Sequence, residues 1–256
     1  FILTMYNVGE PDVFDFAKIV KERHRHIPVV LLTSFSKDIY RRIDERDASG
    51  IDYIFSWSGN TDLVIGIIKL IEDAMNAEED ILTGGVQAIL LVEDSVRFYS
   101  TYLPALYKLI LQQILLATNY ADAVALYERY KKNLLGVISD VGFVLHKGDS
   151  PSTEKLDAGI DLCRLVRADN PLMPVLLQSS QTAFAAQARE LGAGFIAKNS
   201  KTLLQELSDF IAARFAFGDF LFKDLSTGRV IGRAKDLHEM QRLVASVPDD
   251  VFEYNT

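Results

Sequence analysis

Five polar side chains stand where apolar runs of the sequence end. Glu93 and Asp94 follow "AILLV", Asp140 ends "GVISD", Ser179 follows "VLLQ" and Lys198 follows "GFIA". We expect each to lie at the exit of a buried strand, and parallel strands would bring all five to one rim. Three neighbouring carboxylates repel one another and need a cation, and hard oxygen ligands suit Mg²⁺. With a lysine and a hydroxyl to hold phosphate oxygens, this set favours phosphoryl transfer onto a carboxylate.

Five strands that alternate with helices would position these side chains. Apolar runs predict the strands, and the amphipathic stretches between them predict the helices. We expect strands near 87–92, 114–118, 135–139, 174–178 and 194–197, and helices near 95–112, 120–132, 157–168, 182–191 and 200–215. The predicted fold class is therefore α/β, with a flavodoxin-like, doubly wound parallel sheet.

The same pattern occurs twice in the chain. "HIPVVLLTSFSKD" matches "LMPVLLQSSQTAF", and "GIDYIFSWSGNTDLVIGIIKLIED" matches "GAGFIAKNSKTLLQELSDFIAARF". Such a repeat indicates two copies of one domain. The first copy begins at "FILTM", which corresponds to the third strand of the second copy, so we expect residues to be missing before Phe1. "YKLILQQILLATNY" passes from helix to strand without a turn residue, which suggests further missing residues between Gln113 and Ile114.

The second copy resembles a response-regulator receiver domain over roughly residues 86–215. The resemblance lies in "VED" after the first strand, "ISD" after the third, "QSS" after the fourth and "AKN" after the fifth. It implies that Asp140 is the phosphoacceptor. It also implies that Glu93, Asp94 and Asp140 bind Mg²⁺, with the backbone carbonyl of Gly142 as a further ligand.

The same resemblance implies roles for three more residues. Ser179 and Lys198 would contact the phosphoryl group, and Phe195 matches the aromatic residue that turns inward on activation. The chain departs from the family pattern in two places. The loop 141–159 is longer than usual and lacks the Met-Pro that follows the aspartate, and Asn199 replaces the proline that commonly follows the lysine.

The first copy keeps the scaffold and loses the chemistry. Met5 falls at the position of the phosphoacceptor, and Ser56 falls at the position of the lysine. Thr33 remains at the position that matches Ser179, but a lone threonine at the end of a strand usually serves only the local turn. We interpret this copy as a pseudo-receiver kept for packing, dimerisation or partner binding. Trp57 would lie beside the inactive site, either filling it or marking a contact surface.

The pattern divides the chain into four segments. They are the incomplete pseudo-receiver 1–80, a hinge 81–86 containing "TGG", the intact receiver 87–216, and a connector 217–256. The connector is predicted to form a hairpin with "STG" at its turn and then a helix to about Ser246. "GDFLFKDLSTGRVIGRAKDL" resembles the segment after receiver domains in bacterial proteins that end in a region like pyruvate dikinase or phosphoenolpyruvate synthase. The output region itself would lie outside this chain.

Composition excludes several classes of function. The net charge of −8 argues against a nucleic-acid backbone as the main partner. No apolar run approaches the length of a membrane span, and the single Cys163, expected to be buried, excludes an internal disulfide. We therefore expect a cytoplasmic protein without a membrane partner.

Together these features predict a two-component receiver that is phosphorylated on Asp140 with Mg²⁺ and relays a conformational change to a C-terminal output. Its partner would be a sensor histidine kinase or a phosphotransfer protein, and a homodimer is a further option. Its only catalysis would be its own phosphorylation and dephosphorylation. The alternative is an interaction or dimerisation scaffold that is not phosphorylated. A phosphatase with an aspartyl nucleophile is disfavoured, because such enzymes place a second acid two residues after the nucleophile, where this chain has Gly142.

Overall fold

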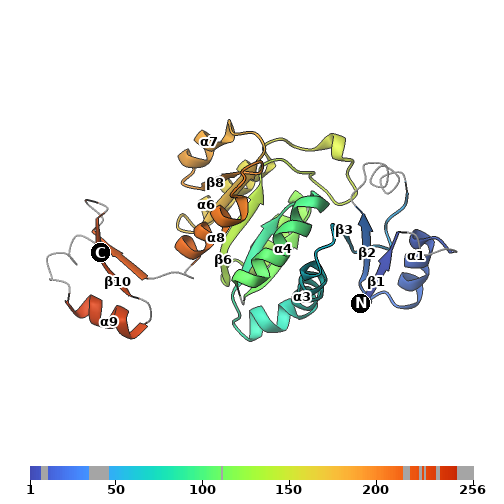
Figure 1. The fold of residues 1–256 in the computed structure, drawn as a ribbon, viewed down its shortest axis with the longest axis horizontal. Helices are drawn as coiled ribbons and strands as arrows, with labels where there is room; N and C mark the ends of the chain where they lie inside the picture. The colour runs from blue at the N-terminus through green and yellow to red at the C-terminus, as the bar shows by residue number, and fades with distance from the viewer. Residues whose placement is uncertain are drawn as a thin grey trace. The chain divides into compact units, whose positions relative to one another are not determined.

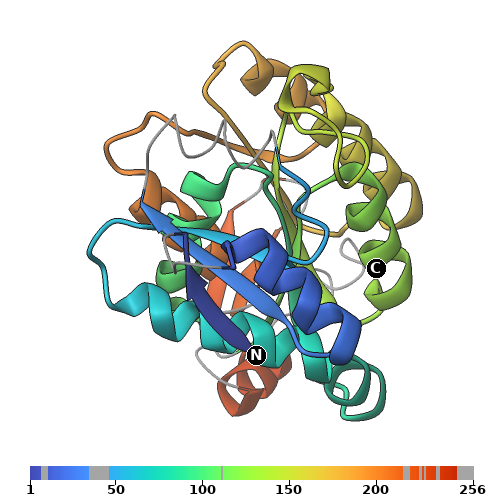
Figure 2. The ribbon, with the colours of Figure 1, turned by 90° about the vertical axis from the view of Figure 1, so that its right-hand side faces the viewer.

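The chain forms two compact units, Phe1–Leu204 and Gln205–Thr256. The computed structural model describes residues 1–6, 11–34, 46–110, 112–215, 220–224, 227, 229–234 and 237–246. The first unit contains two parallel sheets, one from each copy, with helices beside them (Figures 1 and 2). The domain boundaries expected from the sequence, with a break near residue 216, remain a prediction.

The second copy forms a five-stranded parallel sheet in the order β5-β4-β6-β7-β8. The strand bounds lie within one residue of those expected from the apolar runs. This order is the flavodoxin-like, doubly wound order, and it confirms the predicted fold class. The strands are β4 (Ala88–Val92), β5 (Gln113–Ala117), β6 (Leu134–Asp140), β7 (Val175–Ser179) and β8 (Gly194–Ala197). The helices are α4 (Val96–Leu109), α5 (Tyr120–Tyr130), α6 (Ala158–Asp169), α7 (Phe184–Glu190) and α8 (Leu203–Arg214).

The strands of this sheet are buried along most of their length, as continuous apolar runs predict for a parallel sheet. All five residues of β4 are buried. Alternate residues of that strand, Ala88, Leu90 and Val92, join a core cluster with side chains of α5, α6 and α7. Cys163 of α6 lies in the same cluster, as expected for a small buried residue. The strand ends that carry the polar residues therefore continue directly from the buried centre of the sheet.

The first copy forms a smaller parallel sheet in the order β1-β2-β3. Its strands are β1 (Ile2–Met5), β2 (Val29–Ser34) and β3 (Tyr53–Trp57), and its helices are α1 (Val13–Arg23) and α3 (Asp62–Ala77). The chain continues from α3 into a π-helical turn, η1 (Glu78–Thr83). The helical segment thus runs beyond the end expected near residue 80. It stops at "GG", where Gly85 has a φ of 71° that glycine adopts without strain.

Helix α4 of the second copy also covers part of the first copy. The Tyr99 hydroxyl donates to the backbone carbonyl of Ile54 in β3, and the Ser100 hydroxyl accepts from the backbone N–H of Ser56 at 3.0 Å. These bonds occupy backbone groups of an edge strand that would otherwise be unpaired. The two copies are therefore joined through the helix that follows the acid pair.

A half-buried carboxylate makes a second connection between the copies. Asp73 of α3 accepts from the Tyr107 hydroxyl at 2.6 Å and from the backbone N–H of Ile114 at 2.8 Å. Gln113 and Ile114 are consecutive residues of β5, and both pair with β4. The expectation that residues are missing between Gln113 and Ile114 stays a prediction.

The second unit contains an antiparallel hairpin of β9 (Phe220–Lys223) and β10 (Val230–Ala234), followed by α9 (Leu237–Ser246). This confirms the hairpin and the helix end predicted from the sequence. Ser226 and Gly228 of the expected turn lie outside the described residues. Leu243 of α9 packs on Gly232, where a Cβ atom would lie 2.3 Å from Leu243 Cδ1. Among the described helices of both units, none is both long and apolar enough to cross a membrane.

Candidate functional site

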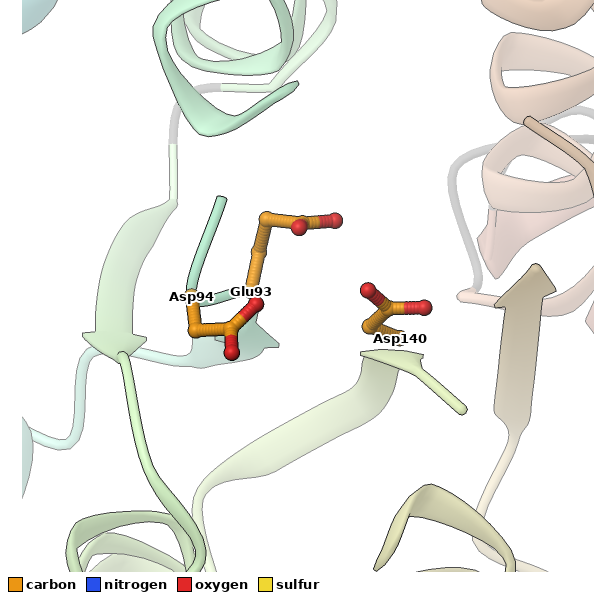
Figure 3. Close-up of side chains that lie close together, drawn as sticks. All are labelled: Glu93, Asp94 and Asp140. Carbon is orange, nitrogen blue, oxygen red and sulfur yellow. The ribbon is translucent and has the colours of Figure 1, made fainter. Parts of the chain in front are cut away.

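Three carboxylates meet at one edge of the second-copy sheet. Glu93 and Asp94 follow β4, and Asp140 is the last residue of the neighbouring strand β6. One carboxylate oxygen from each lies within 4.8 Å of the others, and Figure 3 shows the three carboxyl groups gathered around one space. The structure therefore brings together the three acids that the sequence singled out.

Lys198 places its ammonium group on two of these acids. It directly follows β8, and Nζ lies 2.6 Å from Glu93 Oε2 and also contacts an oxygen of Asp140. Glu93 is 0% exposed and Lys198 is 8% exposed. Nζ also lies 4.3 Å from the ring centroid of Phe98 in α4, a cation–π distance. The lysine is thus held between two carboxylates and an aromatic ring, away from solvent.

Burial and mutual repulsion shift the protonation of the site. Burial, and after it the charge of Asp140, raises the pKa of Glu93 to about 8 and that of Asp94 to about 6. Burial also raises the pKa of Asp140, against the opposing effect of Lys198. For Lys198, burial alone would lower the pKa, but Glu93 and Asp140 outweigh it and raise the pKa. The site is therefore short of positive charge.

The donor set fits a hard divalent cation such as Mg²⁺. Three carboxylates face one ammonium group, so a divalent ion would bring the cluster close to neutrality. Mg²⁺ takes oxygen ligands and is usually held by one or two carboxylates with water and phosphate oxygens. Among the described residues, no basic side chain forms an ion pair with Asp94, which leaves that carboxylate available to an ion.

Ser179 lies at a neighbouring strand end, and within the described residues no hydrogen bond joins its hydroxyl to the three acids. Ser179 ends β7, and its hydroxyl accepts from the backbone N–H of Gln181 at 3.1 Å. Its backbone carbonyl accepts from the N–H of Lys198 at 2.9 Å. The Phe195 ring is half-buried against the core cluster of the second copy. The switch role that the resemblance implies for these two residues stays a prediction.

Two side chains at the site were not predicted from the sequence. Phe98 covers the Lys198 ammonium, but an aromatic residue in an amphipathic helix gives no sign of that contact. Glu154 comes from the long loop, and its carboxylate lies against Gly142. The only signal for Glu154 was the unusual length of this loop.

The first copy has no matching cluster among its described residues. Met5 pairs with Leu32 of β2, as Asp140 pairs with Gln178 of β7, so Met5 stands at the acceptor position. Its side chain is 57% exposed and offers no nucleophilic oxygen. The strand register therefore places Met5 where the sequence comparison expects it, at the position that Asp140 holds in the second copy; the loss of phosphorylation in this copy stays a prediction.

The lysine position of the first copy is Trp57 rather than Ser56. In the second copy, Ala197 pairs with Ser179, the last residue of β7, and Lys198 is the residue after Ala197. The corresponding partner of Thr33 is Ser56, so Trp57 is the next residue. The prediction of Ser56 was wrong because it counted from the preceding glycine, which lies one residue farther from this position in the first copy. Trp57 is half-buried, and its indole carries no positive charge.

Comparison with known proteins finds only distant similarities, all of them to solved structures. No protein-family model matches it, and no curated protein matches its sequence. Among solved structures, it is similar to a response-regulator receiver domain protein from Clostridium thermocellum, with 20% identity over 52% of this chain and 96% of that chain and a TM-score of 0.42. The chemotaxis protein CheY4 of Vibrio cholerae is 20% identical over 49% of this chain and 98% of that one, with a TM-score of 0.38. A two-component response regulator of the LuxR family from Aurantimonas is 21% identical over 62% and 96%, with a TM-score of 0.40.

Proposed function

We propose that the second copy is a two-component receiver domain that accepts a phosphoryl group on Asp140 in a Mg²⁺-dependent reaction. The observation that carries this proposal is the cluster of Glu93, Asp94 and Asp140 at adjacent strand ends, with the Lys198 ammonium on it. The ordered set of sequence motifs at the same strand ends supports it. The donor would be a phosphohistidine on a sensor kinase or phosphotransfer protein, or a small acyl phosphate.

The geometry indicates how the residues would divide the work. A carboxylate oxygen of Asp140 would attack phosphorus while the bond from phosphorus to the donor atom breaks. Lys198 already contacts Asp140 and would neutralise charge on the phosphoryl oxygens as they arrive. Mg²⁺ held by Glu93, Asp94 and Asp140 would supply charge neutralisation when bound. Gly142 lies two residues after Asp140, and its backbone carbonyl is the proposed further ligand.

The signal would leave the site through the neighbouring strands β7 and β8. A phosphoryl group adds a charge of about −1.5 to −2 and strong acceptor oxygens. The Ser179 hydroxyl would turn toward it, and the half-buried ring of Phe195 on β8 would move into the space vacated. This change would reshape the surface around α7 and β8 and reach an output on the C-terminal side.

A scaffold role is the proposal for the first copy alone. That copy has Met5 and Trp57 at the positions of acceptor and lysine, and it is hydrogen-bonded to α4 of the second copy. It would serve packing or partner binding, including dimerisation, without being phosphorylated.

Labelling with acetyl phosphate tests the proposed function. Wild-type protein should take up label with Mg²⁺ and lose that ability in EDTA. Asp94→Ala should lower the labelling rate at least about tenfold, because it removes a ligand of the cation. Glu190→Ala, at the end of α7, removes an exposed carboxylate and should label like the wild type. Equal labelling of wild type and Asp94→Ala would overturn the site assignment.

A further inference from the structure

Residue 142, two positions after Asp140, is a glycine without a side chain. In the structure, the side chain of Glu154 fills the space where a side chain of residue 142 would lie. A Cβ atom on Gly142 would lie 2.2 Å from Glu154 Oε1 and 3.3 Å from Glu154 Cδ. The Glu154 carboxyl group therefore occupies the space that a side chain at position 142 would take. A carboxylate therefore lies against the backbone two residues after the acceptor, although that residue is itself glycine.

The long loop is folded so that it holds Glu154 in this place. Phe143 and Lys155 form an antiparallel bridge, with backbone bonds of 3.3 Å and 3.1 Å in the two directions. In this antiparallel register Leu156 is the residue opposite Gly142, and the Glu154 side chain, one residue before the bridge, reaches across to Gly142. The Lys155 ammonium is also paired with Asp161 of α6, and a 3₁₀ turn, Pro151–Thr153, directly precedes Glu154.

The loop is also anchored to the acceptor strand. Gly159 donates its N–H to the carbonyl of Val141 at 2.8 Å, and a Cβ atom on Gly159 would lie 1.9 Å from the carbonyl oxygen of Asp140. Only glycine permits this approach of backbone to backbone. The position of Glu154 is therefore set by backbone contacts at both ends of the loop.

Glu154 differs from the other carboxylates of the site in being open to water. It is exposed, whereas Glu93 is fully buried and Asp94 and Asp140 are partly buried. Within the described residues, no side chain donates a hydrogen bond or forms an ion pair to its carboxylate. It is also outside the group of three whose oxygens lie within 4.8 Å of one another. An unpaired, solvent-facing carboxylate beside an acceptor can take a proton from water there.

We propose that Glu154 is the general base for hydrolysis of the phosphoryl group on Asp140, an inference that rests on the proposed function. A water oxygen would form a bond to phosphorus while the bond from phosphorus to the Asp140 oxygen breaks. Glu154 takes the proton that the water loses, and Asp140 leaves as a carboxylate. The products are inorganic phosphate and the original protein, after Glu154 returns its proton to solvent. The loop thus sets how long the phosphorylated state lasts.

The decay of labelled protein tests this inference. Protein is labelled with radioactive acetyl phosphate and Mg²⁺, freed of donor by gel filtration, and followed for loss of label. Glu154→Gln keeps the size of the side chain but removes the base, and it should slow the decay about 100-fold, at the low end of general-base contributions. Glu190→Gln, a carboxyl-to-amide change at an exposed position of α7, should decay like the wild type.

A rescue variant separates the base from a structural role. Gly142→Glu combined with Glu154→Ala puts a carboxylate back into the same space from the other side, so it should restore most of the decay rate that Glu154→Ala loses. Circular dichroism and the melting temperature check that the loop variants fold.

Three results would overturn the inference. Decay of Glu154→Gln within about twofold of the wild type would exclude a base that contributes at this level. A higher Mg²⁺ requirement for labelling, with unchanged decay, would make Glu154 a metal ligand instead. Wild-type protein that takes no label would overturn the proposed function as well, which distinguishes that failure from the first two.

Discussion

Glu93 brings a carboxylate into the interior of the second copy, where it is 0% exposed. An unpaired charge there would be costly, and Lys198 Nζ lies 2.6 Å from Oε2 and 2.9 Å from Oε1. The lysine is itself buried, so each partner depends on the other. The pair therefore contributes more to the definition of the site than to net stability, since desolvation offsets much of the attraction.

Removal of the lysine should destabilise the fold. At about pH 9, above the pKa of about 8 that Glu93 has in the folded wild type, Lys198→Met leaves a buried carboxylate without its partner. We expect a loss of about 3–5 kcal/mol in the free energy of unfolding, measured with urea in EDTA. The double variant Glu93→Gln, Lys198→Met should recover most of that loss, because it also removes the buried charge. Lys132→Met, at an exposed lysine, should change stability by less than about 0.5 kcal/mol. A Lys198→Met protein as stable as the wild type would refute this description of the pair.

The raised pKa of Asp94 makes stability depend on pH in a defined direction. The pKa is about 6 in the folded protein against 3.8 as the ordinary value, so the folded state keeps the proton to higher pH. In EDTA, the stability contributed by Asp94 should be greatest below pH 3.8 and should fall as the pH rises to about 6. Asp94→Asn should therefore match the wild type near pH 3.8 and exceed it by about 3 kcal/mol at neutral pH. A difference between the two proteins that does not vary with pH would contradict this prediction.

At the scale of elements, α4 links the acid pair to the first copy. It begins just after Asp94, and its Tyr99 and Ser100 side chains bond the backbone of β3. Helix α3 crosses α4 at Gly66, where a Cβ atom would lie 3.4 Å from the backbone nitrogen of Pro104. A movement of α4 at the site would therefore displace strand β3 in the sheet of the first copy.

The close crossing of α3 and α4 predicts that Gly66 tolerates no large side chain. Gly66→Leu should lower the free energy of unfolding by about 1–3 kcal/mol through overpacking, although leucine has the higher helix propensity. Ala74→Leu lies on an exposed position of the same helix and should be nearly neutral. Urea unfolding of both variants measures the difference. Equal stability of the two would show that the helices do not meet closely at Gly66.

At the scale of the whole molecule, the strands of both parallel sheets could be predicted from the sequence, because apolar runs bounded by polar residues mark strands in any parallel sheet. The cluster of Glu93, Asp94 and Asp140 could also be predicted, since strand ends of such a sheet meet at one edge. The contacts between helices and strands could not be predicted from the sequence. The cover of β3 by α4 depends on hydroxyl groups whose partners are distant in sequence, and the position of Glu154 depends on how the long loop folds back.

The register between β2 and β3 was the other feature that could not be predicted from the sequence. Matching the glycines before the last strand of each copy put Ser56 at the lysine position, whereas the pairing of β2 with β3 puts Trp57 there. A shift of one residue changes which face of a strand a side chain occupies. Hydrophobic patterns that tolerate such a shift cannot decide it, so only the paired strands reveal that the tryptophan replaces the lysine.

The measurement that tests the account most directly is the site of phosphorylation. Wild type, Asp140→Asn and the exposed control Asp15→Asn are incubated with acetyl phosphate and Mg²⁺ and weighed intact by mass spectrometry. We predict that wild type and Asp15→Asn each gain one phosphoryl group that is removed by hydroxylamine, as an acyl phosphate is, and that Asp140→Asn gains none. A phosphoryl group retained by Asp140→Asn, or one mapped to Thr33 in the first copy, would contradict the account.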